Sequence, residues 1–140
     1  DTAKNLGPIP ELIEANKGGS KVGVIHFGTS RDATLEAIDA LAAEGIAVDT
    51  LRIKGFPFHK SVDAFIEQHD TVFVVDQNRD AQMRTLLVNE CLVSPRDLIS
   101  ILNYNGTPIT ARKIRDEIIA VLRGDNVRPL HKKKMAKESV

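Results

Sequence analysis

The sequence has one cysteine, few aromatic residues and no net charge, and each scarcity excludes a class of protein. The single cysteine, Cys91, allows no internal disulfide. Acidic and basic residues number 19 each, so no overall field draws the chain to nucleic acid or an anionic membrane. No apolar run approaches the roughly 20 residues of a membrane-spanning helix. We therefore expect a soluble cytoplasmic domain in which Cys91 is a small buried hydrophobe rather than a nucleophile.

The chain is long enough for one domain, and its two ends lack a regular pattern. Residues 1–21 are broken up by glycine and proline, which predicts an N-terminal arm or linker. Residues 128–140 carry four lysines and little to bury, so we expect a solvated, flexible tail. The folded domain is therefore predicted at residues 22–127.

Four strand–helix units follow one another within that domain. Short apolar runs predict strands at Val22–Phe27, Val48–Ile53, Val72–Asp76 and Leu98–Leu102. Helical spacing predicts buried stripes at Leu35, Ile38, Leu41 and Ala42, then Val62, Phe65 and Ile66, then Met83, Leu86 and Leu87, and finally Ile114, Ile118, Val121 and Leu122. Repeated units with continuously apolar strands favour an α/β fold with three α/β/α layers and a mainly parallel sheet.

Particular residues are expected to begin and end these helices. Thr29, with Asp32 three residues later, forms a capping box at the first helix, and Ser61 and Thr110 cap two later ones. Gly45 and Gly124 follow two predicted helices, where a glycine in the left-handed conformation commonly ends a helix.

Few residue patterns indicate chemistry. Gly28-Thr29-Ser30 at a helix start could hold a phosphate through backbone N–H groups, although a plain capping turn fits better because no nucleotide-binding motif surrounds it. His26 is expected to be a packed, hydrogen-bonded histidine rather than a general base. His59 and His69 lack further ligands at metal spacing, so no metal site is predicted.

The turn after the third predicted strand is the most distinctive place in the chain. The strand ends on Asp76, and four polar residues, Gln77 to Asp80, follow it. Ligands and partners of α/β sheets meet the carboxyl ends of strands. Asp76 could act there as a base or accept bonds from backbone N–H groups. We find no partner for it in the sequence and assign no catalytic residue.

The loop at Phe56-Pro57-Phe58 carries two of the few aromatic side chains. They are either lids on the core or anchors of an interface. We favour the interface, because a proline-containing loop can hold such rings outward at low entropic cost.

Four runs, in order along the chain, resemble the C-terminal domain of the alpha subunit of 2-oxoacid:ferredoxin oxidoreductases, especially the 2-oxoglutarate type. They are VGVIHFGTS at 22–30, LRI at 51–53 with Pro57-Phe58, VDQNRDAQMRTLL from Val75, and NYNGTPITARKIRDEI at 103–118. The family versions of the last two contain VEQNRDGQLRTLL and GxPxTAxxI, which together are specific. Asp76 stands for the usual Glu, and Ala81 for a common Gly, a change that is acceptable if the turn there is already helical.

The resemblance implies a transketolase C-terminal-like fold with one reversed strand. It also implies an assembly that decarboxylates a 2-oxoacid, forms acyl-CoA and reduces ferredoxin; pyruvate, 2-oxoglutarate and branched-chain types share this architecture. Thiamine diphosphate would lie between the alpha subunit's N-terminal domain and the beta subunit, which would also carry an iron–sulfur cluster, and the assembly would contain Mg. This domain would then hold no cofactor and no metal.

The expected role of the domain is packing against those partners. The residues predicted to make subunit contacts are Phe56, Phe58, Asp76, Gln77, Asn78, Arg79 and Gln82. Two alternatives remain open: a freestanding module that binds a phosphate or coenzyme A at Gly28, Thr29 and Ser30, and an assembly domain that dimerises through the aromatic loop.

Overall fold

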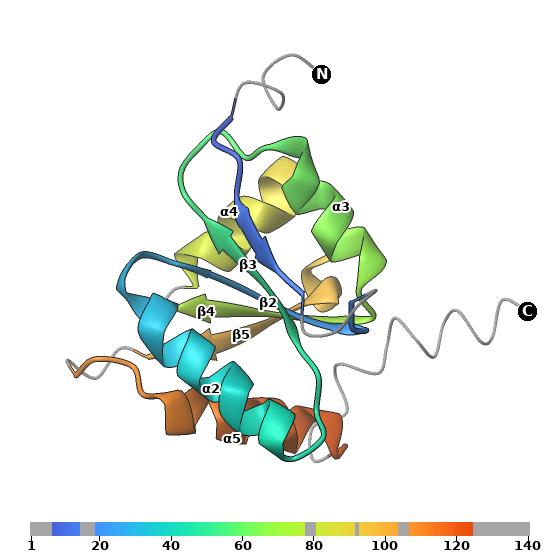
Figure 1. The fold of residues 1–140 in the computed structure, drawn as a ribbon. Helices are drawn as coiled ribbons and strands as arrows, with labels where there is room; N and C mark the ends of the chain where they lie inside the picture. The colour runs from blue at the N-terminus through green and yellow to red at the C-terminus, as the bar shows by residue number, and fades with distance from the viewer. Residues whose placement is uncertain (1–6, 15–18, 78–80, 92, 104–106, 125–140) are drawn as a thin grey trace, which may run out of the picture.

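The computed structural model describes residues 7–14, 19–77, 81–91, 93–103 and 107–124 (Figure 1). Its strands are β1 (Glu11–Ile13), β2 (Val22–Phe27), β3 (Asp49–Ile53), β4 (Thr71–Asp76) and β5 (Leu98–Leu102). Its helices are α2 (Arg31–Ala43), α3 (Lys60–Gln68), α4 (Gln82–Cys91) and α5 (Ala111–Leu122), with 3-10 turns η1 (Gly28–Ser30) and η2 (Pro95–Asp97). The four predicted strand–helix units are therefore confirmed.

The strands form one sheet in the order β1-β3-β2-β4-β5. Strands β2 to β5 are parallel, and β1 pairs antiparallel with β3, with Glu11 opposite Arg52. The mainly parallel sheet is thus confirmed. Strand β1 lies inside the stretch predicted as an arm or linker, where a three-residue strand is too short to show a period in the sequence.

Helices cover both faces of the sheet (Figure 1). Helices α2 and α5 pack on one face, where Val24 and Phe73 of the central strands meet Ile114 and Ile118. Helices α3 and α4 pack on the other face, where the central strands contribute a second apolar cluster. Strands buried on both faces explain why their sequences are continuously apolar.

Three residues placed in the predicted helical stripes are exposed instead, and these predictions were wrong. The exposed residues are Ala42, Leu86 and Leu122. In α2 the fully buried positions are Thr34, Ala37 and Leu41. The stripe of α2 is therefore rotated, because the neighbouring α5 and the sheet decide which side of a helix is covered.

The helix ends agree with the sequence in three places and differ in two, of which the start of α2 is described with the site below. Gly45 and Gly124 have φ angles of 84° and 82°, the left-handed conformation that glycine adopts without strain. Thr110 caps α5 through its side chain. The predicted cap Ser61 was wrong: His59 is the N-cap of α3, and its Nδ1 accepts from the Ser61 backbone N–H at 3.2 Å.

Candidate functional site

The carboxyl edge, where β2 to β5 end, contains a topological switch point between β2 and β4. The chain leaves β2 toward β3 on one side, whereas β4 lies on the other side of β2. Open α/β sheets bind ligands at this kind of crevice. The turns that follow β2 and β4 begin at Gly28 and Gln77, so the structure brings both sequence-predicted turns to one place.

A hydrogen bond links these two turns. The Gln77 Nε2 donates to Thr29 Oγ1 at 2.8 Å, although the residues are 48 positions apart. Both side chains are exposed. Gln77 is therefore partly engaged within the domain, while its remaining surface is free to meet solvent or a partner.

The start of α2 differs from the predicted capping box. The N-cap is Ser30, no side chain caps the helix, and the Ser30 hydroxyl instead donates to the Phe27 carbonyl at 2.7 Å. Asp32 is 97% exposed in its side chain. The prediction failed because η1 inserts a tighter turn, with Gly28 at φ 61°, and shifts the helix start beyond Thr29.

Asp76 is a buried helix cap rather than a surface contact. Its side chain is fully buried, and its two carboxylate oxygens accept the backbone N–H groups of Met83 and Arg84, each at 3.2 Å. The expectation that it lacks a partner was therefore wrong, as was its place among subunit contacts. A carboxylate at the first turn of α4 also complements the helix dipole.

Other residues of the same motif also hold the domain together. The Arg84 Nε donates to the Leu98 carbonyl at 2.8 Å and so ties α4 to β5. Ala81 has a φ of 51°, so its backbone is left-handed. Alanine in place of the family's glycine was expected to be acceptable only in a helical turn, and the turn at Ala81 is not helical. Gln82 is exposed. Asn78 and Arg79 lie outside the described residues.

The aromatic loop divides its two rings between surface and core. Phe56 is 58% exposed, whereas Phe58 is 3% exposed and packs in the α3/α4 cluster. The two rings meet edge to face, with their centroids 5.3 Å apart. Phe58 is thus a core residue and its predicted interface role was wrong, whereas the ring of Phe56 lies on the surface.

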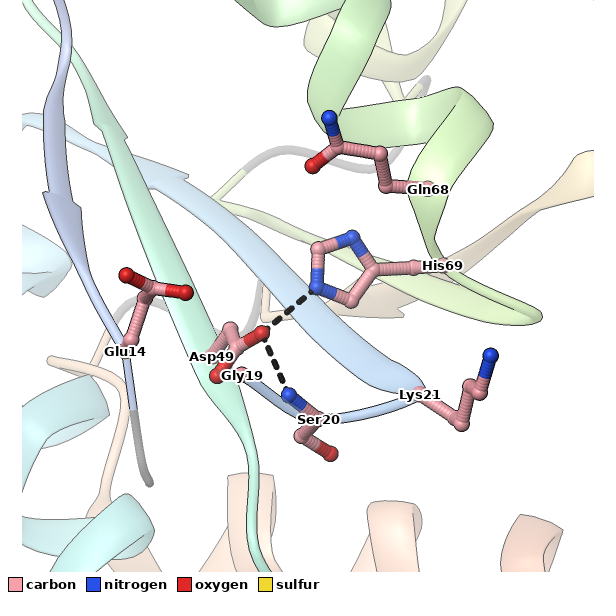
Figure 2. Close-up of a pocket in the computed structure, with 7 residues that line it drawn as sticks. All are labelled: Glu14, Gly19, Ser20, Lys21, Asp49, Gln68 and His69. Carbon is pink, nitrogen blue, oxygen red and sulfur yellow. Dashed lines mark hydrogen bonds and ion pairs between the residues drawn. The ribbon is translucent and has the colours of Figure 1, made fainter. Parts of the chain in front are cut away.

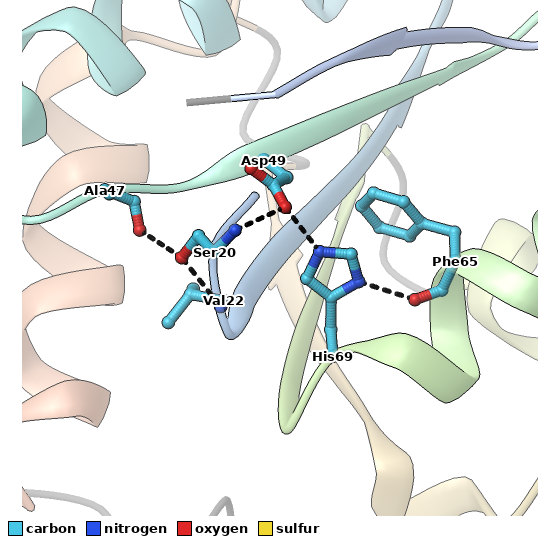
Figure 3. Close-up of polar contacts among 6 residues, drawn as sticks. All are labelled: Ser20, Val22, Ala47, Asp49, Phe65 and His69. Carbon is cyan, nitrogen blue, oxygen red and sulfur yellow. Dashed lines mark hydrogen bonds and ion pairs between the residues drawn. The ribbon is translucent and has the colours of Figure 1, made fainter. Parts of the chain in front are cut away.

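At the amino edge, where β2 to β5 begin, the structure shows a polar network that the sequence analysis missed (Figure 3). Asp49 Oδ2 accepts the Ser20 backbone N–H and contacts His69 Nε2, both at 2.8 Å. The His69 Nδ1 lies 2.6 Å from the Phe65 carbonyl, and the Ser20 hydroxyl donates to the Ala47 carbonyl. The sequence signal that could have indicated this network is Asp49, a polar residue at the start of a buried strand.

An open polar pocket of about 290 Å³ borders this network (Figure 2). Its lining residues are Glu14, Gly19, Ser20, Lys21, Asp49, Gln68 and His69. Both ring nitrogens of His69 are engaged by protein oxygens. Because a carbonyl can only accept, Nδ1 carries the hydrogen of its contact with Phe65, and Nε2 faces the Asp49 carboxylate.

His26 is buried beside two arginines near the carboxyl edge. It is 1% exposed, and its Nδ1 has no hydrogen-bond partner within the described part of the chain. The predicted hydrogen-bonded histidine was therefore wrong for this nitrogen. The pKa of His26 is lowered from 6.5 to about 4, mainly by burial and also by the charges of Arg52 and Arg31, while the Glu11 carboxylate opposes this shift. His26 is a neutral, packed ring at neutral pH.

The described residues show neither a metal-ligand cluster nor a membrane-spanning helix. That part of the chain contains no group of three or more histidine, cysteine or acidic side chains placed to hold a metal ion. Its helices are too short or too polar to cross a bilayer. Cys91 is half-buried and packs against the α3/α4 cluster.

Comparison with known sequences connects the chain to one group of enzymes. Models of protein families give no match. The alpha subunit of a 2-oxoacid:ferredoxin oxidoreductase of Saccharolobus solfataricus is 29% identical over 119 residues, covering 81% of this chain and 18% of that protein. The alpha subunit of 2-oxoacid:ferredoxin oxidoreductase 2 of Aeropyrum pernix is 26% identical, covering 74% and 16%. The chain thus spans less than a fifth of these relatives.

Solved structures give the same connection. A 2-oxoglutarate:ferredoxin oxidoreductase of Magnetococcus marinus, with 2-oxoglutarate, coenzyme A and succinyl-CoA bound, superposes with a TM-score of 0.71 at 25% identity, covering 81% of this chain and 19% of that one. The alpha chain of a probable 2-oxoacid ferredoxin oxidoreductase of Thermoplasma acidophilum shares the fold, with a TM-score of 0.55 at 24% identity, covering 82% and 97%. The chain is therefore a homologue of the alpha subunits of 2-oxoacid:ferredoxin oxidoreductases, which are parts of an oxidoreductase complex.

Proposed function

We propose that this chain is the C-terminal, transketolase C-terminal-like domain of such an alpha subunit, of the 2-oxoglutarate type, with residues 22–127 as its folded part. In this proposal it packs against the alpha subunit's N-terminal domain and the beta subunit in a cytoplasmic assembly. The assembly decarboxylates the 2-oxoacid, transfers the acyl group to coenzyme A and reduces ferredoxin. The observation that carries the proposal is the match of four fifths of the chain to alpha subunits in both sequence and structure.

The chain's own residues support a packing role rather than a cofactor role. One cysteine in 140 residues cannot supply the four thiolates that usually hold an iron–sulfur cluster. The described residues contain no metal-ligand group either. We therefore place thiamine diphosphate, Mg and the cluster in the rest of the assembly, where thiamine diphosphate would supply the chemistry of decarboxylation.

Reconstitution tests this function. We expect the alpha chain containing this domain, together with the beta subunit, to reduce ferredoxin or viologen when 2-oxoglutarate and coenzyme A are both present. Pyruvate and a branched-chain 2-oxoacid serve as comparison substrates. The isolated 140-residue chain should be inactive. An assembled complex that reduces no acceptor with any 2-oxoacid would rule the function out.

The surface proposed to contact the partners is built around the exposed ring of Phe56, with Gln77 and Gln82 at the carboxyl edge. An exposed aromatic held by a core aromatic is a typical interface anchor. We expect Phe56→Ser to weaken binding to the beta subunit roughly 30-fold, which corresponds to about 2 kcal/mol. Leu122→Ser, at another exposed apolar position, is the control and should leave binding unchanged.

A further inference from the structure

The buried pair of Asp49 and His69 joins three segments at the amino edge (Figure 3). Asp49 begins β3, His69 directly follows α3, and Ser20 lies just before β2. Both side chains of the pair are 4% exposed. Asp49 Oδ2 lies 2.8 Å from the Ser20 backbone nitrogen and 2.8 Å from His69 Nε2. The way these segments are held together therefore depends on where the hydrogens of the pair lie.

The hydrogen-bond geometry sets how many hydrogens the His69 ring and Asp49 hold. The Phe65 carbonyl can only accept, so His69 Nδ1, 2.6 Å away, carries a hydrogen. An ionised carboxylate can also only accept, so the 2.8 Å contact between Nε2 and Asp49 Oδ2 needs a hydrogen between the two atoms. A neutral imidazole has one N–H group. The pair thus holds one proton more than a neutral histidine beside an ionised aspartate.

The surroundings of the pair favour this proton on the ring. The Ser20 N–H donates to the same carboxylate oxygen, and such bonds stabilise the ionised form of a carboxyl group. A second carboxylate lies close by (Figure 2): a Cβ atom added to Gly19 would lie 3.0 Å from Asp49 Oδ2 and 3.1 Å from Glu14 Oε2. Lys21 is the other charged residue that lines the adjoining pocket. A positive ring therefore compensates the carboxylate charge that gathers at Gly19.

We propose that His69 is an imidazolium cation in the folded chain, and that its ion pair with Asp49 forms a proton-dependent clasp that fastens residues 19–20 to β3 and to the end of α3. Without the second ring proton, the lone pair of Nε2 would face the carboxylate, and the contact would become repulsive. Loss of that proton therefore opens the clasp. The clasp goes beyond the packing role and needs no partner, so the outcome of reconstitution does not bear on it.

Nitrogen-15 NMR of the full 140-residue chain tests the charge of the ring. At neutral pH we expect both ring nitrogens of His69 to carry a hydrogen. His59 is the internal control, because its Nδ1 accepts the Ser61 backbone N–H and must lack one. As the pH is raised, the Ser20 amide signal should shift in the same step as the His69 ring. An unprotonated nitrogen in His69 at neutral pH, or a Ser20 signal that ignores the ring, would overturn the proposal.

Variants separate the charge of the clasp from its shape. Asp49→Asn keeps a side-chain oxygen for the Ser20 N–H but removes the negative charge, so the His69 ring should lose its second hydrogen at neutral pH. Glu67→Gln, at an exposed position of α3, should leave the ring charged. His69→Gln has no titrating ring and should abolish the pH-dependent shift of the Ser20 amide. A ring that stays doubly protonated in Asp49→Asn would show that Asp49 does not hold the proton, and would overturn the clasp.

Discussion

The two edges of the sheet differ in how their polar residues are used. At the amino edge, Asp49 and His69 are each 4% exposed in their side chains and bond to each other and to backbone groups. At the carboxyl edge, one buried carboxylate caps α4, while Thr29 and Gln77 bond to each other on the surface. The amino edge thus holds a buried network beneath its open pocket, whereas the polar bond between the turns at the carboxyl edge lies on the surface.

This difference places stability at one edge and recognition at the other. Exposed side chains, namely Thr29, Phe56 and Gln77, follow the ends of β2, β3 and β4. Such groups are available to a ligand or a partner, as the switch point of an α/β sheet generally is. Four substitutions, in order of expected effect, test the contrast.

The largest loss is expected at the amino edge. Asp49→Ala removes the acceptor shared by the Ser20 N–H and His69 Nε2, both at 2.8 Å. We expect the free energy of unfolding to fall by about 3–5 kcal/mol, measured by urea denaturation with circular dichroism. Asp39→Ala, on the exposed side of α2, is the control. A loss below about 1 kcal/mol would mean that the network contributes little.

Acid should weaken the fold through His26. The unfolded ring has its usual pKa of 6.5 and the folded ring one of about 4, so the unfolded state binds more protons between these values. Stability is therefore present above pH 6.5 and lost as pH falls toward 4, by up to about 3 kcal/mol at 1.36 kcal/mol per unit. Glu11, Arg31 and Arg52 face this ring.

Replacing the ring isolates its contribution. His26→Leu should have a flatter stability profile over this pH range, whereas His59→Asn, which keeps an acceptor at the cap of α3, should follow the parent chain. Parallel profiles for His26→Leu and the parent, measured by denaturation at each pH, would contradict a neutral buried ring.

The cap at the carboxyl edge should matter less than the amino-edge network. Asp76→Ala leaves two N–H groups of α4 without their acceptor, and we expect a loss of about 2 kcal/mol. Asp76→Asn keeps one acceptor oxygen and should lose about half as much. Hydrogen exchange at the Met83 and Arg84 amides locates the effect; unchanged exchange would argue against the cap. Exposed Asp32→Ala is the comparison.

The smallest change is a gain at the same edge. Ala81 has a left-handed backbone, which costs an L-residue about 1–2 kcal/mol. Ala81→Gly should therefore stabilise the chain by up to about 1 kcal/mol, since glycine's greater freedom when unfolded offsets part of the gain. Ala120→Gly, inside α5, should have the opposite sign. Equal losses in both variants would show that the turn is not strained.

The sequence was sufficient to locate those strands and helices whose residue pattern is local and whose sheet is buried on both faces. Apolar runs located β2 and β5 to the residue, and glycine located the ends of α2 and α5. The motif from Val75 to Leu87 predicted the group of enzymes to which the homologues belong. These features depend on neighbours a few positions apart, so they are visible along the chain.

Tertiary structure alone decided which side chains are exposed or paired at the sheet edges. Nothing local distinguishes Phe56 from Phe58, yet packing buries one ring and exposes the other. Thr29 and Gln77 are 48 positions apart, and Asp49 and His69 are 20 apart. Such contacts arise when the sheet order brings distant strand ends together. The sequence by itself thus determined the strands, the layers and the family motif, and only the folded chain placed a closed network at one edge and accessible groups at the other.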